Sequence, residues 1–189
     1  MKLLIIDNYD SFTYNLVQLV EQAGFVDYSL VKNDQLLGLN SASFEKAIIS
    51  PGPGVASEAG DLMQFLKIHH PEKSLLGICL GYQALAELFG AKLVQLREPM
   101  HGLRNKGIVV NQDPIFKALP NEFFIGHYHS WSVEEKDMPV ELQMLMQDEN
   151  GLPMAFRHRQ FDLVGLQFHP ESVMTEFGVE MIRNWLATT

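Results

Sequence analysis

Apolar runs and helical periodicities alternate along the first half of the chain. Residues 2–7 form an apolar run that ends in an acid, which is typical of a strand buried on both faces of a parallel sheet. The next apolar positions share one helical face before Gly24, and they are Phe12, Leu16, Leu19, Val20 and Ala23. Short strands are then predicted at 28–31 and 47–50, and a helix at 58–69. This order predicts an α/β fold with right-handed crossovers.

The pattern changes after the helix that ends near Gly90, because helical periodicity fades and short strands separated by turn residues appear. Five strands are predicted here, at 92–96, 107–110, 123–126, 142–147 and 153–157. A surface loop is predicted at 97–106 and a last buried strand at 163–168. The closing helix is predicted at 175–187, and its inward residues are Phe177, Met181, Ile182 and Trp185. Together these elements predict a mostly parallel, open, flavodoxin-like sheet with helices on both faces and a small antiparallel extension.

Length and charge narrow the functional class. A chain of 189 residues is expected to form one domain, over 1–189. The net charge of −9 argues against a nucleic-acid partner. The apolar start is too short for a signal peptide, and no run reaches the ~20 residues that span a bilayer. A single cysteine excludes an internal disulfide and a cysteine-rich metal site, so we expect a cytoplasmic protein with neither a metal nor a cofactor.

The only cysteine, Cys79, stands where an apolar strand turns into a helix. Gly77 and Gly81 flank it in a Gly-x-Cys-x-Gly pattern, which is the nucleophile elbow with sulfur in place of oxygen. Glycine is needed there because a strand that becomes a helix within one residue brings its neighbours close to adjacent backbone. The helix N-terminus favours the reactive thiolate. A lone cysteine is more often a small buried hydrophobe, but the two glycines favour the catalytic interpretation.

Two further segments follow predicted strands directly. Residues 51–54 read Pro-Gly-Pro-Gly, and residues 169–171 read His-Pro-Glu. Either segment alone is compatible with an ordinary turn or a structural pair. Ligands in open parallel sheets, however, bind outside the carboxyl ends of the strands, where both segments and Cys79 would meet. Pro170 also favours an extended His169, which places the side chains of His169 and Glu171 on the same side.

The three side chains follow the logic of a catalytic triad. Cys79 would be the nucleophile, His169 the base and later the proton donor, and Glu171 the acid that orients the imidazole. The backbone N–H groups of Leu80 and Gly54 are candidates for an oxyanion hole. Gln83 lies four residues after Cys79 and so on the same helical face.

The chain resembles the triad (class I) glutamine amidotransferases. Within them it is most similar to the glutaminase subunits, component II, of anthranilate synthase and aminodeoxychorismate synthase. Four blocks carry the resemblance, namely residues 7–16, 50–54, 77–83 and 167–172. The first block, Asp-Asn-Tyr-Asp-Ser-Phe-Thr-Tyr-Asn-Leu, is peculiar to the chorismate-using branch. The resemblance covers nearly the whole chain.

The resemblance implies hydrolysis of L-glutamine through a thioester on Cys79, with ammonia passed to a chorismate-binding synthase subunit, component I. It also implies a glutamine site lined by Gly52, Pro53, Gly54, Gln83, Ser130 and Trp131. The chain departs from the family's usual residues at Tyr82, Leu103 and Trp131, where histidine, lysine and leucine are common. Anthranilate synthase, in tryptophan synthesis, is the favoured complex, and aminodeoxychorismate synthase, in folate synthesis, is the alternative.

Two alternative functions are compatible with the same residues. A stand-alone cysteine hydrolase or peptidase would use the same triad without any partner. A binding or regulatory subunit would carry the same residues in an inactive site. Stoichiometric labelling of Cys79 by a glutamine-analogue electrophile would separate an active glutaminase from both.

Overall fold

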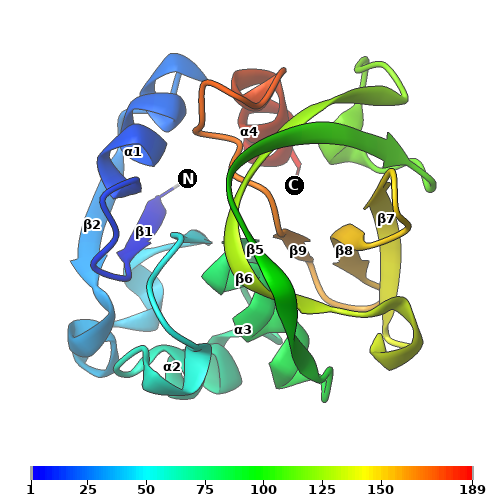
Figure 1. The fold of residues 1–189 in the computed structure, drawn as a ribbon. Helices are drawn as coiled ribbons and strands as arrows, with labels where there is room; N and C mark the ends of the chain where they lie inside the picture. The colour runs from blue at the N-terminus through cyan, green and yellow to red at the C-terminus, as the bar shows by residue number, and fades with distance from the viewer. Residues whose placement is uncertain (1, 189) are drawn as a thin grey trace.

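A computed structural model describes residues 2–188, and within them nine strands form a single mixed sheet (Figure 1). The strand order is β2-β1-β3-β4-β9-β8-β7-β5-β6. Five strands make the parallel half, namely β1 (Leu3–Asp7), β2 (Tyr28–Lys32), β3 (Lys46–Ile49), β4 (Ser74–Ile78) and β9 (Leu163–Leu166). The other four are antiparallel, namely β5 (Leu93–Val109), β6 (Glu122–Val133), β7 (Leu142–Asp148) and β8 (Pro153–His158).

Helices cover both faces of the parallel half. The α-helices are α1 (Thr13–Gln22), α2 (Leu62–His69), α3 (Leu80–Leu88) and α4 (Gly178–Leu186). Alternate residues of β1 point to opposite cores, as expected for a strand buried on both faces. Leu3 and Ile5 pack in the core beneath α1 and α4, whereas Leu4 and Ile6 pack in the core beneath α2 and α3. The predicted α/β sheet with helices on both faces is therefore confirmed.

Short 3₁₀ turns complete the connections, and they are η1 (Asn33–Gly38), η2 (Ser41–Ser43), η3 (Ala56–Glu58), η4 (Pro114–Phe116) and η5 (Glu135–Asp137). Two predicted helices begin later than expected. The helix predicted from 58 begins at Leu62, because Gly60 adopts a φ of +55° between η3 and α2. The closing helix begins at Gly178 rather than 175, because Phe177 has a φ of 61°. Phe177 is also partly exposed instead of buried.

The surface loop predicted at 97–106 was wrong. Those residues belong to β5, a long strand that pairs with both β6 and β7 and arcs across the molecule (Figure 1). The turn residues are absorbed as irregularities in the β5–β6 register, one between Gln95 and Met100 and one between His101 and Leu103. Pro99 and Gly102 occupy these two irregular stretches, and Gly102 has a φ of 67°. Bulges of this kind bend a strand without ending it.

The parallel half gathers the predicted functional segments at one edge of the sheet. The carboxyl ends of β1, β3 and β4 lead into residues 8–12, residues 50–54 and Cys79. The end of β9 leads into residues 167–171 beside them, since β9 pairs with β4. The antiparallel strand β6 crosses the same edge, where the backbone N–H of His169 donates to the carbonyl oxygen of Gly126.

Candidate active site

Cys79 lies in a strained turn between β4 and α3. Its backbone angles are φ 53° and ψ −99°, a conformation that residues other than glycine rarely adopt. Its N–H donates to the carbonyl oxygen of Leu166 at 2.8 Å, so the turn is fixed to β9. The side chain is 5% exposed and reaches a pocket. The predicted elbow is therefore present.

The two flanking glycines have separate steric reasons. A Cβ on Gly77 would lie 2.3 Å from the carbonyl oxygen of Gly81, and a Cβ on Gly81 would lie 2.6 Å from that of Ile49. Real Cβ atoms do not come this close to backbone oxygens. The first turn of α3 thus packs directly on β3 and β4, which explains the Gly-x-Cys-x-Gly spacing.

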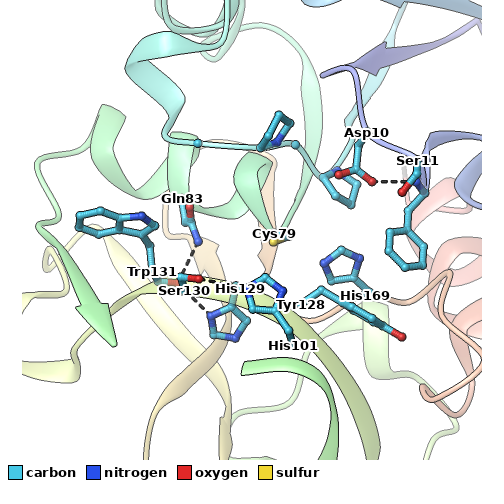
Figure 2. Close-up of a pocket in the computed structure, with 15 residues that line it drawn as sticks. Asp10, Ser11, Cys79, Gln83, His101, Tyr128, His129, Ser130, Trp131 and His169 are labelled. Carbon is cyan, nitrogen blue, oxygen red and sulfur yellow. Dashed lines mark hydrogen bonds between the residues drawn. The ribbon is translucent and has the colours of Figure 1, made fainter. Parts of the chain in front are cut away.

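A pocket of about 330 Å³ opens above Cys79. Figure 2 shows the sulfur of Cys79 between the side chains of Gln83 and His169. The lining residues come from six stretches of the chain, namely Asp10, Ser11 and Phe12; Pro51, Gly52, Pro53 and Gly54; Cys79 and Gln83; His101; Tyr128, His129, Ser130 and Trp131; and His169. The structure therefore brings together the predicted nucleophile, the predicted base and all six predicted glutamine-site residues.

His169 and Glu171 form a buried pair. The Nδ1–H of His169 donates to Oε1 of Glu171 at 2.6 Å, and the two side chains are 2% and 0% exposed. Burial lowers the pKa of His169, but the negative charges of Cys79 and Glu171 raise it more, so this pKa lies well above its usual value of 6.5. The other ring nitrogen, Nε2, is buried and makes no hydrogen bond among the described residues. It is the nitrogen left to exchange a proton at the pocket.

Two aromatic side chains fix the plane of the His169 ring. The centroids of Phe12 and Tyr128 lie 5.3 Å and 5.0 Å from that of His169, both edge-on. The hydroxyl of Tyr128 also lies 3.2 Å from Oγ of Ser172. Neither aromatic was predicted as a site residue, since Phe12 was assigned to the buried face of a helix.

Gln83 connects α3 to β6 at the far end of the pocket. Its Nε2 donates to the carbonyl oxygen of Trp131 at 3.0 Å and to Oε1 of Gln167 at 3.2 Å. The neighbouring Ser130 lies on the pocket wall, with its Oγ 3.0 Å from Nε2 of His101. These contacts hold the Ser130–Trp131 backbone beside the side chain of Gln83 (Figure 2).

Two buried histidines lie next to this wall and were missed in the sequence. The Nδ1–H of His129 donates to the carbonyl oxygen of Trp131 at 2.9 Å, and its Nε2 lies 3.3 Å from Nδ1 of His127. His127 in turn contacts Oδ1 of Asn105. Burial lowers the pKa of His127 to about 4 and that of His129 to about 3, so both rings are neutral at pH 7. Their alternation along β6 is the signal that could have placed them on one face.

Backbone N–H groups are available beside the sulfur. Leu80 begins α3, and the first N–H groups of a helix have no acceptor within it. Within residues 2–188, no oxygen accepts a hydrogen bond from the backbone N–H of Gly52 or Gly54. Gly54 adopts a φ of +71°. Of the two predicted oxyanion-hole residues, Gly54 lines the pocket and Leu80 directly follows Cys79.

Other site classes find little support in the part of the chain that the structure describes. No group of three or more His, Cys, Asp or Glu side chains there could hold a metal ion. Among the same residues, no helix is both long and apolar enough to span a membrane.

The family model described as Glutamine amidotransferase class-I matches residues 4–189. The chain belongs to the class I glutamine amidotransferases. The family assignment agrees with the pocket, in which a cysteine elbow, a histidine and a glycine loop meet at one sheet edge.

Relatives of this class I glutamine amidotransferase carry two related descriptions. It is 39% identical to an anthranilate synthase component 2 of Pyropia yezoensis, over 97% of this chain and 98% of the relative. It is 38% identical to an aminodeoxychorismate synthase component 2 of Escherichia coli (strain K12), over 97% and 98% of the two chains. An aminodeoxychorismate/anthranilate synthase component 2 of Bacillus subtilis (strain 168) is also 38% identical, over 98% and 96%.

Solved structures show the same fold. The crystal structure of a glutamine amidotransferase from Thermotoga maritima superposes with a TM-score of 0.74 at 16% identity. The match covers 98% of this chain and 96% of that one. At this level of identity the likeness concerns the arrangement of strands and helices.

Proposed function

We propose that this amidotransferase hydrolyses the side-chain amide of L-glutamine and passes the ammonia to a chorismate-aminating synthase. The observation that carries the proposal is the buried His169–Glu171 pair, which leaves Nε2 of His169 free beside the sulfur of Cys79. Since the pKa of His169 is raised, its imidazolium persists near neutral pH, and a cation beside a cysteine favours the thiolate. This is the form in which a cysteine acts as a nucleophile.

The chemistry proceeds in two steps on Cys79. The thiolate attacks the amide carbon of glutamine, His169 gives its proton to the departing nitrogen, and the C–N bond breaks to release ammonia. A γ-glutamyl thioester remains on the sulfur. Neutral His169 then takes a proton from water, whose oxygen attacks the thioester and displaces the thiolate as glutamate forms. Glu171 accepts from Nδ1 throughout, which keeps Nε2 directed at the reacting atoms.

The surrounding groups have supporting roles in this proposal. The N–H groups of Leu80 and Gly54 stabilise the oxyanion of each tetrahedral intermediate. The backbone at 52–54, together with Gln83, Ser130 and Trp131, holds the α-amino and α-carboxylate groups of glutamine. The reaction needs no cofactor or metal. A single domain in the cytoplasm is the setting that the chain length and the lone cysteine favour.

The descriptions of the relatives support a proposal for the partner synthase. Their descriptions as component 2 of anthranilate synthase or of aminodeoxychorismate synthase support a chorismate-binding component I as the partner. Anthranilate synthase, and so tryptophan synthesis, is our primary proposal. The relative that carries both descriptions supports the alternative in which the subunit serves aminodeoxychorismate synthase, and so folate synthesis.

The proposal is tested by glutaminase turnover of the purified chain with and without each synthase, in the presence and absence of chorismate. We expect the isolated chain to be slow, because the free N–H groups at 52–54 sit in a loop rich in glycine that docking can align. One oxyanion donor changes the rate by roughly 100- to 1000-fold, so we expect activation of that order. Full activity of the isolated chain, unchanged by either synthase, would contradict activation of the glutaminase by synthase docking. It would favour a stand-alone hydrolase.

A further inference from the structure

Asn8 directly follows β1 and is buried against the start of the glycine loop. Its side-chain Nδ2 donates to the carbonyl oxygen of Ser50 at 2.8 Å, and its backbone N–H donates to Oγ of Ser50 at 3.0 Å. Oγ of Ser50 in turn donates to the carbonyl oxygen of Pro51 at 2.8 Å. Both Asn8 and Ser50 are at most 2% exposed. Two residues distant in sequence thus share a buried set of hydrogen bonds just before residues 52–54.

The orientation of the Asn8 amide is fixed from its other side. Nδ2 of Asn33 donates to Oδ1 of Asn8 at 3.1 Å. The amide must therefore accept with its oxygen and donate with its nitrogen at the same time. Asparagine supplies both groups on one short side chain, whereas aspartate of the same shape supplies only acceptors.

The loop itself has little else to hold it. Among the described residues, the backbone N–H groups of Gly52 and Gly54 make no hydrogen bond, and Pro51 and Pro53 have none to offer. Gly52 packs so closely on Asn8 that a Cβ there would lie 2.6 Å from Cβ of Asn8 and 2.4 Å from Cδ2 of Leu80. Asn8 therefore anchors the loop both by hydrogen bonds and by contact.

We propose that Asn8 is a positioning residue for the glutaminase reaction, which holds the backbone of residues 52–54 so that its N–H groups face the pocket of Cys79. The inference rests on the proposed function. Asn8 itself does not line the pocket, so it acts through the carbonyl of Ser50 and through Gly52. A shift of the loop by a fraction of an ångström would misdirect oxyanion donors while leaving the triad in place.

Asn8 is followed directly by a residue at the protein surface. Tyr9, the next residue, has a φ of 61° and is 54% exposed. Its hydroxyl donates to Asp34 at 2.8 Å, and the Lys32 ammonium lies 3.9 Å from its ring centroid. Asn8 is thus placed between an exposed, conformationally constrained residue and the loop that borders the sulfur.

The test is Asn8→Asp, measured in the complex with the synthase. The carboxylate keeps the acceptor for Asn33 and the shape of the side chain but loses the donor to Ser50 and repels its carbonyl oxygen. We expect kcat for glutamine hydrolysis to fall by about 100-fold, the order lost with one oxyanion donor, with KM changed by less than about threefold. The rate of Cys79 alkylation by iodoacetamide should stay at the wild-type value, because that reaction forms no oxyanion.

Two further variants keep the test decisive. Asn40→Asp is the matched control, since Oδ1 of Asn40 accepts from the N–H of Ala42 and aspartate preserves this contact; it should behave as wild type. Asn33→Ala removes the donor that orients the Asn8 amide and should lower kcat in the same direction but less. The kcat of Asn33→Ala tests the proposal if Asn8→Asp does not fold.

Three outcomes would overturn the inference. They are wild-type kcat in Asn8→Asp, an equal fall of kcat and alkylation rate in that variant, or, if it does not fold, wild-type kcat in Asn33→Ala. Failure of the proposed function is distinguishable, because the wild-type complex would then show no glutamine hydrolysis at all.

Discussion

Cys79→Ser is expected to abolish glutamine-dependent product formation by the complex with its synthase while leaving ammonia-dependent formation nearly intact. The serine hydroxyl is a far weaker nucleophile than a thiolate paired with an imidazolium, so the thioester step is lost. Ammonia supplied in solution bypasses that step. Loss of a covalent nucleophile costs several powers of ten, so we expect less than about a thousandth of the wild-type glutamine-dependent rate.

The ammonia-dependent rate is the internal control for this prediction. It reports whether the mutant subunit still folds and still binds the synthase. A mutant complex that used glutamine at more than about a thousandth of the wild-type rate would show that Cys79 is not the nucleophile. Loss of both activities would point to a damaged complex instead.

His169→Ala is expected to be more severe than Glu171→Gln. Alanine removes the imidazole proposed to exchange protons beside the sulfur, so glutaminase activity should fall by several powers of ten. Glutamine at 171 can still hold the imidazole, although in a less suitable tautomer. The comparison is made as glutaminase rate at saturating glutamine, and equal or reversed severity would show that Glu171 does more than orient His169.

The same pair of variants has a pH signature. The charge of Glu171 is one cause of the raised pKa of His169, so Glu171→Gln should lower that pKa. In the wild type the imidazolium persists as pH rises past 6.5, and in the variant it is lost at a lower pH. The pKa of His169 can be followed by NMR of the imidazole protons. An unchanged value in Glu171→Gln would mean that Cys79 alone raises it.

Local sequence predicted the elbow because both of its glycines stand within two residues of Cys79. Gly77 and Gly81 are required because the first turn of α3 packs closely on β3 and β4. The Gly-x-Cys-x-Gly spacing is sufficient to predict this arrangement. The buried strands of the parallel half were predicted for the same reason, since a run of apolar residues suffices to mark them. His169 and Glu171 lie two residues apart in extended chain, so the sequence also predicted that their side chains lie on the same side.

The strands of the antiparallel half were harder to predict from the sequence. Pro99 and Gly102 normally mark a loop, and only pairing with β6 shows that β5 continues through them with two register irregularities. No local sequence pattern predicted the residues that support the triad. Phe12 and Tyr128 reach His169 from α1's start and from β6, and Asn8 reaches Ser50 across 42 positions of sequence. Contacts of this kind depend on the packed sheet rather than on any local pattern.

The most direct measurement is mass spectrometry of the complex quenched in acid during turnover of glutamine. The account predicts one γ-glutamyl group on the peptide that contains Cys79, removed by hydroxylamine and absent from Cys79→Ser. Rapid turnover with no adduct on Cys79, or with an adduct on another residue, would contradict it.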